Sequence, residues 1–568
     1  MKKVTALLLA LCLAATMLAA CSSSSKEETT KAAETTAAEK TEAAKADETE
    51  ASTEAAKEDE TEAPAPSGGD PFANLPDAVT MGGTIKGTPE MYPDVDLSKH
   101  ETIYVTLVGD TPNDFPDIKD KINEYLEPFN TDVEFTIYGW SEYGDMYTLA
   151  LTSGEKIDLI FTAPWCYLWT EANKGSFKSF DEEFLETYMP LTKKYQLPES
   201  MAGVKLNGKY IALPQNTTNP NGKIVAIRQD LAEKYGINEL TSWDDYMNFM
   251  LTIAEKETPD SGILAIASAG NNSEFWDVYQ QQIGRMQAMK TGDYCSFTYT
   301  YDQKIPSFDE IELCWDTDLF RDFCKDMKTL MDAGAWSRSA LTNSITDDDA
   351  FAALSGASIA WNGTVFNYME MAEKTEGVRT MAYDITMDHF APAEAYNNND
   401  MAITSSSKNP ERAAMVLDLF KNDTYLNHLF RLGIEGVHYT IDENGFYTEL
   451  DKAADYPSDN VSICWAIKNG DIEQAGVEER KKAISDEQKA KMAACPTEGF
   501  VFDDSAVQFE KAAVDEVFMN YVPSLELGLF DDPDATIDQM LKEAEAAGLE
   551  ALKAEFQNQY EAWYASMQ

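Results

Sequence analysis

The sequence predicts an α/β fold, and three observations in its first third support that prediction. Residues 101–108 (ETIYVTLV) and 131–138 have the pattern of strands. Residues 157–161 (IDLIF) form a short apolar run that is typical of a buried strand. The stretches 117–129 and 143–151, which separate these strands, have helical character. Such a βαβαβ alternation indicates a parallel sheet with helices on its faces.

An aromatic cluster follows the third predicted strand. Thr162, Ala163 and Pro164 do not continue the strand, and Trp165, Tyr167 and Trp169 then fall within five residues. In an open α/β sheet, ligands bind just outside the carboxyl ends of the strands. The cluster therefore predicts a binding platform, and the alternative is that the rings are buried under the next helix.

The rest of the chain continues the mixture of strands and helices. A hairpin is expected over 204–214, with Asn207-Gly208 at its turn, and a second hairpin over 440–447. Short strands are expected at 223–227, 263–268 and 357–361. Helices are expected at 230–235, 243–254 (capped by Thr241 or Ser242), 320–333, 349–354 and 409–420, the last with Pro410 in its first turn. From Ser505 onward the pattern is helical, with interruptions at Pro523 and at 531–533.

The amino-terminal region predicts secretion and anchoring. Residues 1–20 read as a signal peptide, in which Lys2-Lys3 precedes an apolar run too short to span a membrane. Leu18-Ala19-Ala20-Cys21 resembles the lipobox of bacterial lipoproteins, which implies cleavage before Cys21 and attachment of a lipid to its sulfur. Residues 21–70 are rich in Ala, Thr, Glu and Lys and predict a disordered acidic tether. We therefore expect the mature protein on the outer face of the cell membrane.

Charge and cysteine usage exclude several classes of protein. The chain of 568 residues has 99 acidic and 45 basic residues and a formal charge of −54, which argues against nucleic-acid binding and against a polybasic membrane contact. After Cys12 and Cys21 are set aside, six cysteines remain without CxxC spacing. A bridge between Cys314 and Cys324 and buried free thiols both remain open.

Motifs for catalysis are weak. Residues 203–209 (GVKLNGK) approach a P-loop, but Tyr210 stands where a magnesium-binding Ser or Thr is needed, and the stretch reads as a hairpin. The chain has no HExxH or GxSxG motif, and its four histidines lack metal-ligand spacing. We therefore expect no catalytic residues, metal or cofactor. Paired acids such as Asp347-Asp348-Asp349 leave a glycosidase open on residue types alone.

Four stretches carry a resemblance to a known family. NGKYIALP (207–214), KIVAIRQDL (223–231), SKNPERAAMVLDLF (407–420) and GIEGVHY (433–439) resemble the extracellular solute-binding proteins of bacterial ABC importers, the class that includes maltose-binding protein. Residues 499–533 resemble a helical domain of unknown function that ends one subset of them.

The resemblance implies a two-lobed periplasmic-binding-protein-like fold that closes on ligand at a hinge. Lobe 1 would hold 98–216 and 398–440, and lobe 2 would hold 222–392 and, together with the helical C-terminal region, 441–568. The crossings at 215–222 and 396–399 would form the hinge.

Ligand recognition is the function that remains. Sugars present C–H faces that pack on aromatic rings, and hydroxyls that need donors and acceptors. We therefore predict a monomeric lipoprotein that captures an oligosaccharide and delivers it to an ABC permease; a peptide ligand, or a surface protein that hydrolyses or adheres to glycans, is the alternative. The predicted ligand-binding residues are Asp110, Asn113, Trp140, Trp165, Tyr167, Gln215, Trp276, Trp361, Asn362, Glu435, His438 and Trp465.

Overall fold

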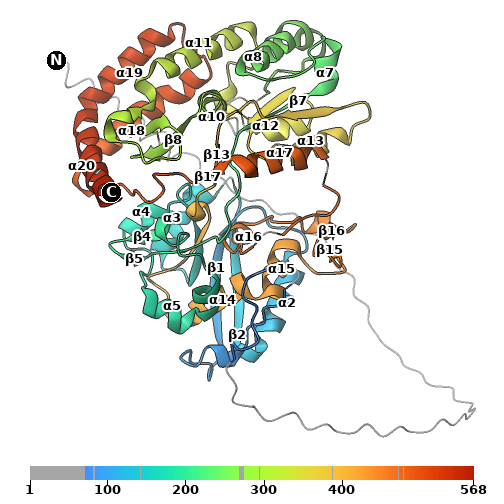
Figure 1. The fold of residues 1–568 in the computed structure, drawn as a ribbon, viewed down its shortest axis with the longest axis vertical. Coiled ribbons are helices and arrows are strands. Elements are labelled where there is room, and N and C mark those ends of the chain that lie inside the picture. Colours follow the sequence, from blue (N-terminus) through green and yellow to red (C-terminus); the bar gives the residue numbers. More distant parts are fainter. Residues whose placement is uncertain are drawn as a thin grey trace, which may run out of the picture. The chain divides into compact units, whose positions relative to one another are not determined.

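The computed structural model describes residues 71–567, apart from 81–82, 141, 268–273, 293, 344, 387, 471 and 478. The predicted signal peptide, the lipid attachment site Cys21 and the acidic tether lie outside these residues. The described chain forms two lobes, each with its own sheet and hydrophobic core (Figure 1).

Lobe 1 is built on a five-stranded sheet of order β2-β1-β3-β14-β6. The strands β1 (Glu101–Val108), β2 (Thr131–Tyr138) and β3 (Leu159–Thr162) run parallel, as predicted, with helices α2 (Phe115–Leu126) and α3 (Tyr143–Ser153) between them. The chain steps from β1 out to β2 and then back across β1 to β3. Right-handed connections therefore place α2 and α3 on opposite faces of the sheet.

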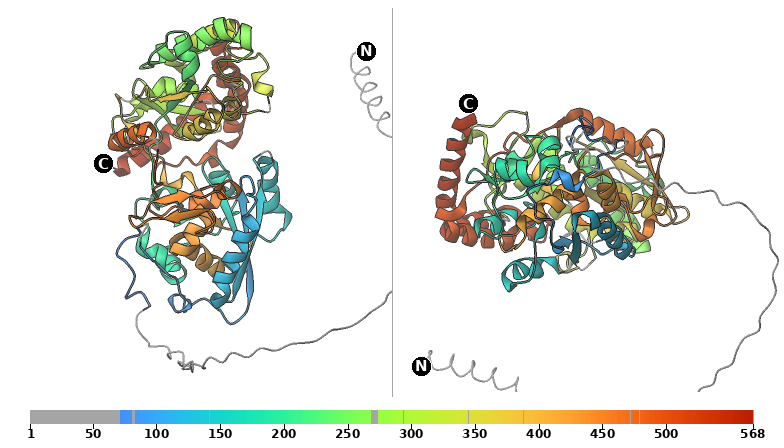
Figure 2. Two further views of the ribbon diagram at one scale, coloured as in Figure 1. Left: turned by 90° about the vertical axis from the view of Figure 1, so that its right-hand side faces the viewer. Right: turned by 90° about the horizontal axis from the view of Figure 1, so that it is seen from below.

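Segments from late in the chain complete lobe 1. Strand β14 (Asp400–Ile403) pairs antiparallel with β3, and β6 (Leu213–Pro214) pairs antiparallel with β14. Together they extend the sheet to five strands. The helices α5 (Glu182–Tyr188), α6 (Pro190–Tyr195), α14 (Pro410–Asn422), α15 (Thr424–Leu432) and α16 (Ser462–Ala466) cover it. In Figure 2 the orange late helices lie among the blue and teal early elements.

The expected lobe boundary at residue 440 is wrong. Tyr456, Val461, Ile463, Cys464 and Ile467 are buried in the core of lobe 1, so this lobe continues well past the predicted end. The hairpin of β15 (Tyr439–Ile441) and β16 (Tyr447–Glu449) lies within this return. The physical reason is that apolar side chains after the hairpin pack against β1 and β3, a long-range contact that local patterns do not reveal.

Lobe 2 has two three-stranded sheets. In the first, β7 (Ile224–Arg228) lies between β11 (Ser358–Trp361) and β12 (Thr380–Tyr383), antiparallel to both. The second comprises β8 (Arg285–Lys290), β9 (Ser296–Thr300) and β10 (Glu312–Leu313). Around them lie α7 (Gln229–Lys234), α8 (Trp243–Thr252), α10 (Phe275–Gln281), α11 (Asp318–Ala333), α12 (Asp347–Ala352), α13 (Val365–Glu373) and α17 (Glu479–Lys491).

Three details of lobe 2 differ from or refine the prediction. Ser242 caps α8 by accepting a hydrogen bond from the Asp245 amide, which selects it over Thr241. The expected strand at 263–268 is wrong over its described part, because Leu264 makes only an isolated bridge to Gly356. Cys314 and Cys324 are buried free thiols rather than a bridge.

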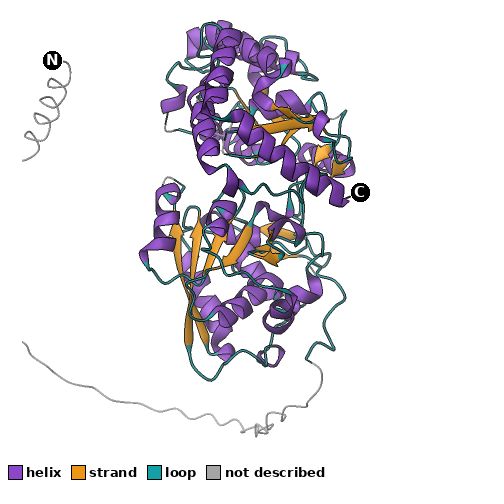
Figure 3. Cartoon of the chain, turned by 90° about the vertical axis from the view of Figure 1, so that its left-hand side faces the viewer, coloured by secondary structure: helices purple, strands orange, loops and turns teal. Residues whose placement is uncertain are grey.

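The C-terminal helices belong to the core of lobe 2. α18 (Gln508–Glu526), α19 (Pro533–Ala547) and α20 (Leu549–Met567) pack on α11 and on the second sheet, where Phe556 stacks on Phe297 at 4.2 Å between ring centroids. Figure 3 shows how strongly helices dominate here. The predicted interruption at Pro523 is wrong, because α18 runs through it. Burial of Phe518 and Val522 before Pro523, and of Leu525 after it, holds the helix together across the one hydrogen bond that proline cannot make.

Three chain segments connect the two lobes, and these segments lie next to one another. Residues 215–222 and 392–399 pair antiparallel, with a bridge between Pro220 and Ala393 and a hydrogen bond of 2.7 Å from the Asn221 amide to the Pro392 carbonyl. The third segment, 468–478, begins beside the first, where the Asn216 amide donates to the Lys468 carbonyl at 2.8 Å. We call the first two segments the hinge crossings.

One helix, α14, lies inside lobe 1 with nearly every side chain buried. A helix buried on all sides is normally apolar throughout, yet α14 contains Arg412, Asp418 and Lys421. Asp418 is fully buried, and its carboxylate accepts hydrogen bonds from the Tyr92 hydroxyl at 2.9 Å and from the first-turn amides Leu191 and Thr192 of α6 at 3.1 and 2.6 Å. Asp418 therefore caps α6 from another helix.

Removal of the Asp418 carboxylate should destabilise the protein strongly. Asp418→Ala leaves three buried donors without an acceptor, and each such group costs about 1–3 kcal/mol. We expect a loss of about 3–5 kcal/mol in the free energy of unfolding, measured by urea denaturation. The exposed Asp451→Ala in the same lobe should change it by less than about 0.5 kcal/mol. Equal effects of the two substitutions would contradict this role.

Acid should weaken lobe 1 through His428 of α15. Burial, and secondarily the charge of Arg431, lower the pKa of His428 from 6.5 to about 4. A folded pKa below the unfolded one gives stability that is present above pH 6.5 and is lost as the pH falls through 4. When the pH is lowered from 7 to 4.5, the free energy of unfolding should fall for both proteins. The fall should be about 2 kcal/mol smaller for His428→Gln than for the parent protein. Parallel pH profiles for the two proteins would contradict the assignment.

Candidate ligand-binding site

The carboxyl ends of the parallel strands of lobe 1 bring three predicted site residues to one edge. Asp110 follows β1, Trp140 follows β2 and Trp165 follows β3. β1 and β2 are in register from end to end, with Val108 opposite Tyr138. The loops after them therefore leave the sheet side by side, where α/β folds place their ligands.

Three tryptophans meet at this edge. Trp140 stacks on Trp465 with 5.9 Å between ring centroids and 15° between planes. Trp165 lies 6.2 Å from Trp140 and 6.5 Å from Trp465. Trp140 and Trp165 remain 44% and 41% exposed despite these contacts, so apolar ring surface is open to solvent. We call Trp140, Trp165 and Trp465 the tryptophan platform.

Hydrogen bonds to backbone carbonyls fix two of the indoles. The Nε1 of Trp165 donates to the Asn398 carbonyl at 2.8 Å, and that of Trp465 donates to the Asp459 carbonyl at 2.7 Å. The helix that carries Trp465 is itself held to β1, because the Val108 amide donates to the Ser462 hydroxyl at 2.9 Å. The platform is thus preorganised by the fold.

Polar groups border the platform. Asp110 is exposed, and a Cβ built on Gly139 would lie 3.9 Å from its Oδ1, so this carboxylate adjoins the loop that presents Trp140. Asn113 is also exposed, but its amide donates to the Asp455 carboxylate at 3.1 Å. Aromatic surface beside an exposed carboxylate can pack on the C–H face of a sugar and accept from its hydroxyls.

Tyr167 faces away from the platform. Its backbone is left-handed, with φ of 59°, and this turn directs the side chain toward α3. There the hydroxyl donates to the Gly144 carbonyl at 3.1 Å, and the ring lies 5.1 Å from Tyr147. Tyr167 therefore supports the loop after β3 rather than adding a fourth exposed ring.

Three predicted site residues are buried against protein partners. Trp276 lies in the core of lobe 2, with Phe320 and Phe323 within 5.4 Å between ring centroids. Gln215 is fully buried in the first hinge crossing. His438 is 1% exposed. These three side chains are enclosed by protein atoms, and the proposed function does not use them as ligand contacts.

The contacts of His438 show a structural role. Its Nδ1 accepts a hydrogen bond of 2.9 Å from the Ile434 amide, so the proton must be on Nε2. Nε2 then donates to the Asp114 carboxylate at 3.2 Å, which fastens the hairpin region to the start of α2. Its neighbour Glu435 is exposed and belongs to the turn that bridges to Tyr439.

Trp361 and Asn362 lie in lobe 2. The Trp361 ring is half-buried and stacks on Tyr368 at 6.5 Å between centroids. The side-chain oxygen Oδ1 of Asn362 accepts hydrogen bonds from the amide and hydroxyl of Thr364, just before α13 begins. Both side chains thus have structural contacts within lobe 2.

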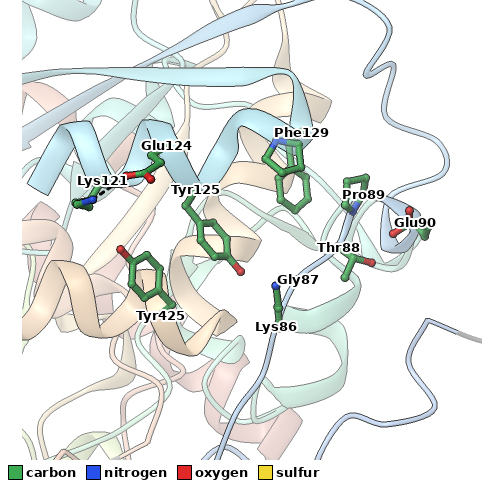
Figure 4. A pocket seen from close by; sticks show the side chains of 11 residues that line it. Lys86, Gly87, Thr88, Pro89, Glu90, Lys121, Glu124, Tyr125, Phe129 and Tyr425 are labelled. Carbon is green, nitrogen blue, oxygen red and sulfur yellow. Dashed lines mark hydrogen bonds and ion pairs between the residues drawn. The ribbon is translucent and has the colours of Figure 1, made fainter. Parts of the chain in front are cut away.

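A separate pocket lies at the other end of the lobe 1 sheet. It has a volume of about 570 Å³ and opens beside the carboxyl end of α2, which leads into the start of β2 (Figure 4). Its lining includes Tyr125 and Tyr425, which stack at 5.2 Å, and Lys121, which pairs with Glu124 at 2.8 Å. None of the residues that line it is among the predicted ligand-binding residues.

Two partners of the platform were not predicted. Asn398 and Asp459 accept hydrogen bonds from the Trp165 and Trp465 indoles on their backbone carbonyls. Every residue has such a carbonyl, so the sequence does not show which ones will bind an indole. Asn398 was expected only as part of the hinge. Within the described residues, no group of three His, Cys, Asp or Glu side chains could hold a metal ion.

Comparison with known proteins gives two family matches along the chain. Residues 111–424, more than half of the chain, match the family described as bacterial extracellular solute-binding protein. Residues 496–565 match a domain of unknown function. These residues include all of α18 and α19 and most of α20.

Individual relatives are distant but extend over most of the chain. A carbohydrate ABC transporter substrate-binding protein of Streptococcus pneumoniae is 22% identical over 82% of this chain and 91% of its own length. The crystal structure of the N-glycan transport solute binding protein from S. pneumoniae gives a TM-score of 0.63 at 19% identity, covering 82% of this chain and 100% of that one. The S. pneumoniae substrate-binding protein FusA in complex with kestose gives 0.59 at 15% identity, covering 82% and 100%.

Proposed function

The chain belongs to the bacterial extracellular solute-binding proteins, and we propose that it captures an oligosaccharide and delivers it to an ABC importer. The tryptophan platform is the observation that carries this proposal. Three indoles lie within 6.5 Å of each other, two of them (Trp140 and Trp165) keep exposed ring surface, and an exposed carboxylate lies beside them. The names of the distant relatives, which refer to carbohydrates, N-glycan transport and kestose, support the same ligand class.

The mechanism we propose is capture without catalysis. A sugar packs one ring face on the outer surfaces of Trp140 and Trp165 while Asp110 accepts from its hydroxyls. Contacts from the second lobe then favour the closed form, since a ligand shifts such an equilibrium only by its differential affinity for the two states. Trp361 and Asn362 are our proposed contributors from lobe 2, and the closed form docks on the permease.

Location and partners are part of the proposal. We propose that a lipid on Cys21 and the acidic tether hold the protein on the outer face of the cell membrane, where it acts as a monomer beside its permease. Among the described residues, no helix has the length and apolar character needed to cross a bilayer.

Loss of one platform ring should weaken sugar binding. Trp165→Ala removes an aromatic anchor and should cost about 1–3 kcal/mol, or roughly 5- to 150-fold in Kd, measured by titration calorimetry. Tyr425→Ala is the matched control, because this 47%-exposed ring lies in the pocket at the opposite end of the sheet. It should leave the affinity unchanged. An unchanged Kd for Trp165→Ala, with an intact fold, would remove Trp165 from the site.

Ligand class and reaction are tested together. Oligosaccharides and peptides are screened by tryptophan fluorescence and thermal shift, and the stabilisation should grow with the logarithm of ligand concentration over Kd. The proposal expects saturation by one sugar family with no release of reducing ends. A response confined to peptides would keep the importer and discard the sugar. Release of reducing ends would identify a hydrolase instead.

A further inference from the structure

One carboxylate joins the two hinge crossings. Oε2 of Glu394, in the second crossing, accepts a hydrogen bond of 3.2 Å from the side-chain amide of Gln215 in the first. Oε1 of the same residue accepts one of 2.6 Å from the side-chain amide of Asn398. The Glu394 backbone amide also donates to the Asn219 carbonyl at 2.8 Å. A single residue thus contacts both hinge crossings.

The carboxylate sets the direction of a chain of hydrogen bonds. An ionised carboxylate only accepts, so the NH2 groups of Gln215 and Asn398 must point toward Glu394. The carbonyl oxygen of Gln215 is then left to accept from the Asn399 side chain, at 3.0 Å. Because Gln215 is fully buried, a reversed amide would put two donors face to face without water to relieve them.

The same chain reaches the tryptophan platform. Asn398, which Glu394 holds by its side chain, accepts the indole N–H of Trp165 on its backbone carbonyl at 2.8 Å. The orientation of this exposed ring therefore depends on where the second crossing lies. Movement of the second crossing would therefore displace the carbonyl that accepts from the Trp165 indole, and one connected set of hydrogen bonds links this crossing to the ring.

We propose that Glu394 is a positioning residue that fastens the hinge crossings to each other and couples their movement to the Trp165 ring. The coupling to ligand rests on the function proposed above, whereas the fastening of the crossings does not. Glu394 contacts no ligand in this proposal. Its effect on affinity arises because a sugar meets a Trp165 ring that is already held in place, which reduces the ordering cost of binding.

Two substitutions at Glu394 separate its hydrogen bonds from its charge. Glu394→Ala removes both acceptors. Glu394→Gln keeps one oxygen for Gln215, and its new NH2 can donate to the Asn398 side chain once that amide rotates. Both contacts thus survive without charge. Glu443→Ala, at an exposed hairpin tip, is the control for loss of a surface carboxylate.

The first measurement needs no ligand. Hydrogen–deuterium exchange of the full chain is followed in peptides covering 215–221 and 392–399, with β1 and β2 as the reference for an intact fold. Glu394→Ala should speed exchange at least fivefold in both crossings, including the one that does not contain the substitution, because their shared fastening is lost. Glu394→Gln and Glu443→Ala should match the parent protein. Unchanged exchange in 215–221 for Glu394→Ala would overturn the proposal.

The second measurement tests the coupling. For a saccharide that binds the parent protein, Glu394→Ala should raise Kd about tenfold, which corresponds to the net contribution of one to two hydrogen bonds. The Kd of Glu394→Gln should stay within about threefold of the parent value. Loosened crossings with an unchanged Kd would overturn the coupling to Trp165. If no saccharide binds the parent protein, the proposed function fails, and the exchange experiment still decides whether Glu394 fastens the crossings.

Discussion

The structure of lobe 1 depends on the cost of burying charge in a helix that lies inside the protein. A buried charged side chain must have partners, and α14 finds them in segments that are otherwise far from it in sequence. Arg412 donates to the Phe129 and Asn130 carbonyls before β2, at 3.1 and 3.0 Å. Asp418 caps α6. The helix that a hydropathy argument would make purely apolar instead fastens the early half of the lobe to the late half.

The same constraint extends to the site. Lys421 is 1% exposed, and its ammonium donates to the Pro214 carbonyl at 2.5 Å and approaches the Ala466 carbonyl at 3.4 Å. Pro214 is the last residue before the first hinge crossing, and Ala466 follows Trp465. Burial lowers the pKa of Lys421 to about 7, while the nearby Asp400, also fully buried, has its pKa raised well above its usual value. The base of the hinge and the helix that carries Trp465 are therefore held by one buried side chain.

Local pattern was sufficient for β1, β2 and β3 of the first lobe, for α2, α3 and α14, and for the aromatic residues after the strands, since strand alternation and chain order place Trp140 and Trp165 at one edge. It did not predict β14, α5, α6 or α15. It could not separate Trp465 from Trp276. Both follow polar stretches and lie in short helices, yet Trp465 belongs to the platform and Trp276 fills the core of lobe 2. Long-range packing decides between them. The misplaced boundary at 440 has the same cause, because Ile463 and Ile467 enter the lobe 1 core only through contacts with distant strands.

The attachment of Trp165 to the hinge differs in kind from the other contacts of the platform. Its indole donates to a backbone carbonyl, so any side chain at 398 leaves the acceptor in place, and only displacement of the main chain can break the bond. Hinge motion consists of such displacement at the ends of elements. The orientation of the ring and the position of the crossing are therefore linked by the path of the chain rather than by residue choice. Under the proposed function, a ligand that packs on Trp165 would act on a group that the hinge crossing already holds, so binding at the edge of one lobe would bias the movement of both.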